Sequence, residues 1–439
     1  GKSNHNKRKN KECYNCNSKI MNNKQQINIQ NRIIFGVIAV LALIRLIFIV
    51  KTGIYTPGMQ NDVGTLDASR NGHLGYIYYL AYGGDIIHND AAVNYQFYHP
   101  PLHYMIAALW LRIVMLFGMS LKMAGESLQF LTLAYSIASL IFVDKIVKIM
   151  NGGFKARIIA LVMAGLFPYS IIMAGSVNND GLVTLLMLIT IWYMLEYSEK
   201  QDLKTAFKTG IFFGLAIMTK TSALTLGPGI LVFMLYQYYR NKKSRMKYID
   251  HYIVFGLVSS VIGLWYPLKN HIIYKMPFLY VPRLGNDINQ YIGGYGLVER
   301  LFDFTGGWWK TPGVVFDEKN VDYNIFTTFS KFGMFAESRY YEGSKIKEEL
   351  FKVLLCIFMI VIVLSFICAL LWLAGEIRHG NRQVGIMLAV MYVTIIISYI
   401  RFCIAYPHVC TMHVRYVMVA VFMTAVFSGL YIEKINKMK

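Results

Sequence analysis

Residues 33–50 read IIFGVIAVLALIRLIFIV, and this stretch decides the fold class of the chain. A helix of these 18 residues would be about 27 Å long, close to the thickness of the hydrocarbon core of a bilayer. Its one charged residue, Arg45, lies near the end of the stretch, where we expect the side chain to snorkel toward the membrane surface. No small-residue cleavage site follows, so we interpret the stretch as a signal anchor rather than a cleaved leader.

Composition extends this interpretation to the rest of the chain. Hydrophobic residues make up 56% of the sequence and aromatic residues 15%, and apolar runs of membrane-spanning length recur along it. The net charge of +20 is high enough for a nucleic-acid-binding protein, but the Lys and Arg residues cluster between or beside the apolar runs. That placement is typical of the cytoplasmic loops of membrane proteins. We therefore predict an all-α polytopic membrane protein with no nucleic-acid partner.

The distribution of basic residues also predicts a topology. Residues 1–32 contain eight Lys or Arg and one Glu, so we expect the amino terminus inside and the first apolar run leading outward. The basic loop at Gly152–Arg157 should again lie inside, yet two apolar runs, Leu102–Gly118 and Leu128–Met150, precede it. Only one of them can cross the membrane. Because Leu102–Gly118 follows two prolines and contains Arg112, we expect this run to lie flat at the interface.

We predict about ten spans, with both termini cytoplasmic and one transmembrane domain at residues 33–439. Residues 1–32 should form a disordered basic tail. Two long outer loops are expected: residues 51–127, with interfacial juxtamembrane helices, and residues 268–350, as an external lid. Besides Ile33–Val50, the predicted spans are Leu128–Met150, Ile158–Gly175, Leu182–Tyr197, Ala206–Thr219, Ser222–Tyr239, Tyr252–Pro267, Phe351–Ala374, Val384–Ile400 and Val414–Ile432.

Two acidic residues are the main candidates for catalysis. Asp62 lies about ten residues beyond the first apolar run, close enough to remain near the membrane surface. Asp180 ends the sequence Asn178-Asn179-Asp180 at a tight outward turn between two predicted spans. Two carboxylates that face one outer cavity suit acid–base chemistry or metal-assisted transfer. The simpler interpretations are a solvated loop acid for Asp62 and a helix cap for Asp180.

Basic residues at the same predicted face are candidates for binding an anion. Lys220 interrupts an apolar run and is followed by two hydroxyl residues, which suits a phosphate held at the membrane surface. Arg415, with His413 just before it, begins the last predicted span and also suits a phosphate or pyrophosphate. Snorkelling of Lys220 and head-group anchoring by Arg415 are the alternatives. If Lys220 lay within one long span instead of between two short ones, Arg378–Arg382 would face outward, against the positive-inside rule.

Aromatic residues of the outer loops are candidates for contacting a substrate. Tyr98, His99 and His103 surround two prolines at the start of the flat helix, and Trp308 and Trp309 lie in the 268–350 loop. Such rings stack on sugars, but they are also common at membrane interfaces. His99 and His103 have one-turn spacing, yet no third ligand is fixed by spacing, so packing and hydrogen bonding are favoured over metal binding.

Taken together, these motifs resemble the GT-C superfamily of polytopic membrane glycosyltransferases. The likeness is to the branch of protein O-mannosyltransferases and lipid A aminoarabinose transferases, and it extends over roughly residues 33–432. The matching segments, in order, are Gln60–Gly64, Gly72–Tyr76, Tyr98–Leu102, Ser176–Asp180, Lys220, Trp265–Asn270, Phe329–Gly333 and Met412–Tyr416.

The resemblance implies sugar transfer from a polyprenyl-phosphate donor on the outer face of the plasma membrane. It implies a catalytic role for Asp62 and for Asp180, and acceptor recognition by the outer loops, since the sequence ends soon after its last span. Asn61 stands where such relatives often have His, which disfavours a metal at this loop and leaves a divalent cation as an open alternative. The acceptor, whether protein, lipid or wall polymer, and the sugar itself are not identified by these motifs.

A transporter or flippase of a lipid-linked or anionic solute is the alternative from another functional class. Lys220, Asp180 and Arg415 would then form an intramembrane relay. A transporter is expected to carry charged residues and broken helices at mid-depth in several spans. The polar residues here concentrate at one predicted face, which favours the enzyme.

Overall fold

The computed structural model describes residues 2–56, 62–94, 96–242, 245–316, 321–337 and 345–438. Within these ranges the regular structure is helical and no β-strand occurs, which confirms the all-α prediction. The α-helices are α1 Lys2–Lys51, α2 Gly72–Ala81, α3 Leu102–Leu116, α4 Leu121–Ile149, α5 Phe154–Leu166, α6 Pro168–Met173, α7 Asp180–Lys200, α8 Leu203–Thr219, α9 Gly227–Arg240, α10 Arg245–Gly263, α11 Trp265–Tyr274, α12 Leu297–Phe302, α13 Ile325–Phe335, α14 Lys345–His379, α15 Arg382–Ala405 and α16 Met418–Met438. The 3-10 turns are η1 Thr221–Leu226, η3 Gly307–Trp309, η4 Val409–Met412 and η5 Val414–Val417.

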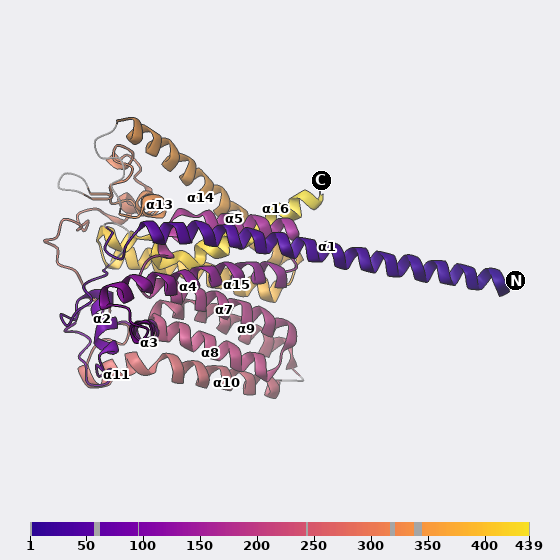
Figure 1. Cartoon of the computed structure of the whole chain (residues 1–439), viewed down its shortest axis with the longest axis horizontal. Coiled ribbons are helices and arrows are strands. Elements are labelled where there is room, and N and C mark those ends of the chain that lie inside the picture. The colour runs from indigo at the N-terminus through magenta and orange to yellow at the C-terminus, as the bar shows by residue number, and fades with distance from the viewer. Residues whose placement is uncertain are drawn as a thin grey trace.

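The long helices form a bundle in which α7 is the central element. Helix α7 packs between α4 and α8, and 78% of the residues in its most apolar window are buried, against 11% for α14. A helix that is apolar on all sides is expected in such a central position. Figure 1 shows the long helices running side by side, with α2, α3 and α11 at the end of the bundle opposite the two termini.

Among the described residues, six helices are long and apolar enough to cross a membrane, or seven if α10 and α11, which meet at a bend of 55°, form one span. Helices α5, α8 and α9 have 13, 17 and 14 residues, fewer than the roughly 20 that cross a bilayer untilted. The count of ten spans therefore stays a prediction. The span expected at Ile158–Gly175 is not one continuous helix, because the chain breaks at Phe167 and restarts as α6 with Pro168 in its first turn.

The helix expected to lie flat is present as the separate apolar helix α3. Its 15 residues make it too short to be a span, and it packs against α2 at one end of the bundle (Figure 1). His103, Tyr104 and Leu111 face inward, whereas Leu116 and Phe117 are 86% and 85% exposed. This distribution fits a helix that lies at a membrane interface.

Helix α1 includes the basic amino-terminal segment. It begins at Lys2 and runs without a break into the first apolar run, and disorder over residues 1–32 stays a prediction. The 50-residue helix contains no proline, and elongation of an existing helix is far easier than its nucleation. Figure 1 shows its first half projecting beyond the bundle.

Arg45 does not snorkel, as the sequence had suggested, but is fully buried within the bundle. Its Nε donates to the Ser136 hydroxyl of α4 at 2.9 Å and its Nη2 to the Ser170 hydroxyl of α6 at 2.8 Å. Its Nη1 donates to the carbonyl of Leu41 at 3.0 Å. The guanidinium thus ties α1 to two other helices.

We predict that Arg45→Ala lowers the free energy of unfolding of the detergent-purified protein by roughly 2–3 kcal/mol, because several charge-assisted hydrogen bonds are lost from a buried site. Thermal unfolding is the measurement, with Arg112→Ala at an exposed position of α3 as the control. Equal melting temperatures for the two variants would contradict a structural role for Arg45.

Candidate active site

One cavity of about 760 Å³ lies at the end of the bundle that carries α2, α3 and α11. Asp62, Asp180, Lys220 and Arg415 all line it, although they come from four separate segments of the chain. The sequence predicted that Asp62 and Asp180 face one cavity and that Lys220 and Arg415 lie at the same face; their proposed roles stay predictions.

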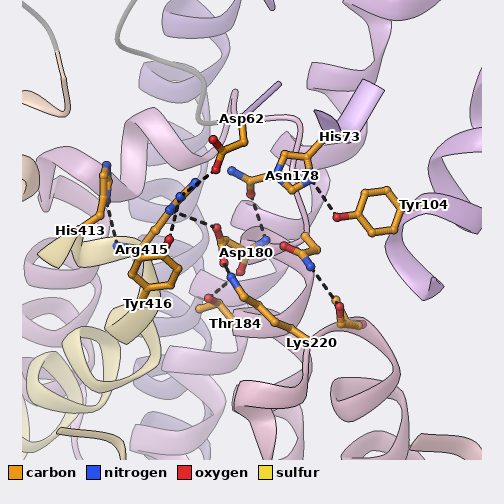
Figure 2. A network of polar contacts seen from close by, with 12 residues as sticks. Asp62, His73, Tyr104, Asn178, Asp180, Thr184, Lys220, His413, Arg415 and Tyr416 are labelled. Carbon is orange, nitrogen blue, oxygen red and sulfur yellow. Dashed lines mark hydrogen bonds and ion pairs between the residues drawn. The ribbon is translucent and has the colours of Figure 1, made fainter. Parts of the chain in front are cut away.

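The four side chains form a connected charge network (Figure 2). Lys220 Nζ contacts Asp180 Oδ1 at 2.5 Å, and Arg415 Nη2 contacts Asp62 Oδ2 at 3.2 Å. Arg415 Nε lies 4.0 Å from Asp180 Oδ2, which joins the two pairs. The side chain of Asp180 is only 3% exposed and that of Arg415 7%, whereas that of Asp62 is 34% exposed. Asp62 is therefore the carboxylate more accessible from the cavity.

The turn before α7 places Asp180 and Lys220 side by side. The Asn178 side chain accepts a hydrogen bond from the Asp180 backbone N–H at 3.0 Å, and the Asn179 side chain donates to the Thr219 carbonyl at 3.2 Å. The second bond fixes the turn against the end of α8, directly before Lys220. The capping interpretation of Asp180 is wrong, because Asn179 occupies the cap position and the Asp180 side chain contacts Lys220.

Arg415 is oriented by its neighbours in the η4–η5 segment. Its backbone N–H donates to His413 Nδ1 at 3.2 Å, and its Nη2 contacts the Tyr416 hydroxyl at 2.8 Å. The His413 ring packs against Tyr169 and Phe332, with ring centroids at 4.7 and 4.3 Å. His413 was predicted to bind phosphate, but it is not among the residues that line the cavity. Its role in the structure is to accept the Arg415 backbone hydrogen bond from outside the cavity lining.

Asp62 is held by backbone contacts with the start of α2. Its carbonyl accepts a hydrogen bond from the His73 N–H at 3.0 Å, and its own φ is +52°. Gly72, with φ +69°, passes so close that an added Cβ would lie 2.6 Å from the Asp62 carbonyl oxygen and 2.5 Å from the Gly64 nitrogen. Only glycine allows this approach, and it lets Asp62 reach toward Arg415.

An aromatic layer lies beside Asp62. His73 and His99 stack with ring centroids 6.3 Å apart, and His73 Nδ1 pairs with the Tyr104 hydroxyl at 2.8 Å. Burial lowers the pKa of His73 to about 4 and that of His99 well below its ordinary value, so both rings are neutral at physiological pH. His99 and Tyr98 line the cavity, as the sequence suggested.

Three predicted substrate contacts lie elsewhere. His103 is fully buried between Tyr104 and Tyr135 and does not line the cavity, because the prolines before it end the loop and α3 turns it into the core. Trp308 and Trp309 belong to η3, outside the cavity lining. The Trp309 side chain is 54% exposed.

The structure adds cavity residues that sequence reasoning did not select. Glu337 follows α13 and lines the cavity with Asp62 and Arg415. Burial raises the pKa of the Glu337 carboxyl, although the Arg415 charge opposes this shift. Gln96 and Asn270 also line the cavity. Asn270 ends the motif Trp265–Asn270, and Gln96 lies two residues before the motif Tyr98–Leu102. Neither a charge nor a periodic pattern distinguished these two residues in the sequence.

The residues of this site are a poor match for a divalent cation. Within the ranges that the structure describes, no cluster of three or more His, Cys, Asp or Glu has a metal-binding arrangement. Both carboxylates, Asp62 and Asp180, already contact basic side chains, and a cation between them would face Lys220 and Arg415. Asn61, cited above in connection with a metal, lies outside the described residues.

A family model described as dolichyl-phosphate-mannose-protein mannosyltransferase matches residues 98–265. Over that range it confirms the resemblance to protein O-mannosyltransferases that the motifs suggested. The matched range contains Asp180 and Lys220 but neither Asp62 nor Arg415. A search of curated proteins found no match.

Two solved structures from Archaeoglobus fulgidus are similar to this chain at low sequence identity. The oligosaccharyltransferase in complex with Zn and sulfate is 13% identical with a TM-score of 0.47, over 92% of this chain and 49% of that one. The oligosaccharyltransferase AglB in complex with an inhibitory peptide and a dolichol-phosphate is 11% identical with a TM-score of 0.47, over 92% and 50%. This chain therefore spans about half the length of the solved structures that it matches.

We predict that Gly72→Ala displaces the Asp62 backbone, because the new methyl group would overlap the Asp62 carbonyl. Hydrogen–deuterium exchange should show lost protection of the amides of His73 and Leu74, which bond to the first loop. Gly83→Ala is the matched control, since Gly83 also has a positive φ of +85° but nothing lies within 4 Å of the position that a Cβ would take there. Similar exchange in both variants would refute the close approach.

We also predict strong energetic coupling between Asp180 and Lys220. Either Asp180→Asn or Lys220→Met leaves one buried charge without its partner, so the double variant should lose less stability than the sum of the single variants. The expected coupling in chemical denaturation is about 1–3 kcal/mol. The more exposed pair Glu196–Lys200 serves as the control, with an expected coupling below about 0.5 kcal/mol. A buried pair that couples no more than this control would show the prediction to be wrong.

Proposed function

We propose that this protein transfers a sugar from a polyprenyl-phosphate donor to an acceptor hydroxyl at the outer face of the plasma membrane, with both termini in the cytoplasm. The observation that carries the proposal is the charge network of Asp62, Asp180, Lys220 and Arg415, which we call the floor of the cavity. Two acidic and two basic side chains meet there within one cavity. The family match to dolichyl-phosphate-mannose-protein mannosyltransferases supports the same donor class. The acceptor is a protein, lipid or wall polymer that carries a hydroxyl group.

Lys220 and Arg415 bind the donor phosphate in this proposal. Arg415 Nε is buried without a hydrogen-bond partner among the described residues, and Lys220 uses one of its three donors on Asp180. Both side chains line the cavity. Each of the two side chains therefore has a donor available for a phosphate oxygen.

The polyprenyl chain lies along an apolar wall of the same cavity. This wall is formed by α7, η1, α9, α15 and α16, which also bound the charged floor. Its combination with a phosphate-binding floor suits a ligand with a charged head and an apolar tail. The apolar wall residues are Val183, Met187, Leu224, Pro228, Ile395, Ile397, Met418 and Val419.

Asp62 acts as the general base. It accepts the proton of the acceptor hydroxyl while the acceptor oxygen attacks the anomeric carbon of the sugar. The bond between that carbon and the phosphate oxygen breaks, and the lipid phosphate leaves with the electron pair. Lys220 and Arg415 stabilise the charge that develops on this leaving group. Asp180 is a positioning residue that holds Lys220, and the anomeric configuration inverts because a single displacement occurs.

The transporter or flippase alternative receives less support. The charged side chains of Asp62, Asp180, Lys220 and Arg415 gather in one cluster, close to His73 of α2 (Figure 2). A relay for translocation would need ionisable groups distributed along the depth of the spans.

We predict that Asp62→Asn lowers transfer by about 100-fold to 10,000-fold, because general-base catalysis contributes rate factors of this size. The purified variant is incubated with radiolabelled polyprenyl-phosphate sugars and an extract containing acceptors, and the release of label from the lipid is measured. The matched control is Asp67→Asn, an acid of the same loop that does not line the cavity. Full transfer by Asp62→Asn, or equal loss in both variants, would refute the assigned role.

A further inference from the structure

Two amide side chains of the cavity carry acceptor atoms that have no hydrogen-bond partner. Gln96 is 2% exposed and Asn270 is 4% exposed, and the side-chain oxygen of each is buried and unbonded among the described residues. Both residues line the cavity. A buried polar atom without a partner costs about 1–3 kcal/mol, so these oxygens point to a ligand that donates hydrogen bonds.

The backbone at Gln96 is strained in a way that turns this residue toward the cavity. Its φ is +72°, a left-handed conformation that costs a non-glycine residue roughly 1–3 kcal/mol. The conformation is kept by the His99 N–H, which donates to the Gln96 carbonyl at 3.2 Å. Strain of this kind clusters at binding sites, where the surrounding structure maintains it.

Helix α11 fixes the second amide beside the first. The Tyr266 hydroxyl donates to the carbonyl of Phe97, the residue after Gln96, at 2.5 Å. Tyr266 and Asn270 both belong to α11 and lie one helical turn apart. One tyrosine therefore joins the loop of Gln96 to the helix of Asn270.

A short series of contacts connects these amides to the proposed reaction centre. Gln96 bonds to His99, the His99 ring stacks on His73, and the His73 N–H donates to the Asp62 carbonyl. Gln96 is thus connected to Asp62 through two histidines, whereas the apolar wall is formed by other elements.

We propose that Gln96 and Asn270 form the subsite for the transferred sugar, with their amide oxygens accepting hydrogen bonds from hydroxyl groups of an uncharged hexose ring. This inference rests on the proposed function and names the residues that select the sugar. Neutral amides suit neutral hydroxyl donors, while the charged groups of the floor are engaged with one another and with the phosphate. A site built to bond a hydroxyl discriminates strongly against a ligand that lacks it.

The test compares a sugar-free lipid with glycosylated lipids on the full-length, detergent-purified protein. Equilibrium binding is measured for sugar-free polyprenyl phosphate and for polyprenyl-phosphate mannose, glucose and galactose, and the hexose that binds most tightly is used further. Gln96→Leu and Asn270→Leu should each weaken binding of that glycosylated lipid by about 10-fold to 100-fold. Binding of the sugar-free lipid should not change, because its phosphate and chain contact other residues.

Gln129→Leu is the matched control for loss of a buried amide. Gln129 is 3% exposed and also has an unbonded side-chain atom, but it does not line the cavity. This variant should bind both lipids as the unaltered protein does.

The outcomes separate this inference from the proposed function. If the unaltered protein binds neither lipid, both are wrong. If it binds the lipids but the Leu variants lose affinity for both equally, or for neither, the sugar subsite alone is wrong. Should the variants fail to fold, monodeoxy donors are tested with the unaltered protein. Removal of at least one hydroxyl must then weaken binding about 10-fold. Equal affinities for all the monodeoxy donors and the unmodified donor would overturn the subsite.

Discussion

The contact between Arg415 and Asp62 is the constraint on which the cavity floor depends. It joins residues 353 positions apart, so the loop after α1 and the segment before the last helix must meet. Burying these charges is costly, and the cost is offset only when each has an opposite partner within reach. Because Arg415 also approaches Asp180, and Asp180 contacts Lys220, displacement of either Arg415 or Asp180 breaks two of these contacts at once. The floor therefore behaves as one unit.

Part of this site could be predicted from the sequence, for a physical reason. Asp62, Asp180, Lys220 and Arg415 each stand near an end of an apolar run, and the positive-inside rule assigns those ends to one side of the membrane. The predicted topology therefore places them at one face of the membrane. Their pairing does not follow from topology, because it depends on the side-chain directions that packing sets. Gln96 escaped notice since an amide in a loop has neither charge nor periodicity, and its importance comes from a backbone conformation that only the fold defines.

The helices, like the site, could be predicted from the sequence only in part. The all-α architecture follows from the long apolar runs of the sequence. The positive-inside rule predicts that only one of the two apolar runs before the basic loop at Gly152–Arg157 crosses the membrane, and the other run forms the separate helix α3. The structure departs from the prediction where local chemistry outweighs the apolar pattern. Pro168 divides one expected span, and serines on two neighbouring helices allow Arg45 to remain inside the bundle. A serine in an apolar run is a weak signal until its neighbour across the bundle is known.

The neutral balance of the network has a consequence for the order of events in the proposed reaction. Two acids and two bases leave the floor without net formal charge, so an arriving lipid phosphate competes for the donors of Arg415 and Lys220. Asp180 is almost fully buried and keeps Lys220 close, whereas the more exposed Asp62 holds Arg415 through one contact at 3.2 Å. A phosphate that attracts Arg415 therefore weakens the contact between Arg415 and Asp62 before it weakens the contact between Lys220 and Asp180. The carboxylate then becomes a better proton acceptor when the donor is in place, which couples general-base catalysis to donor binding and limits transfer to the loaded site.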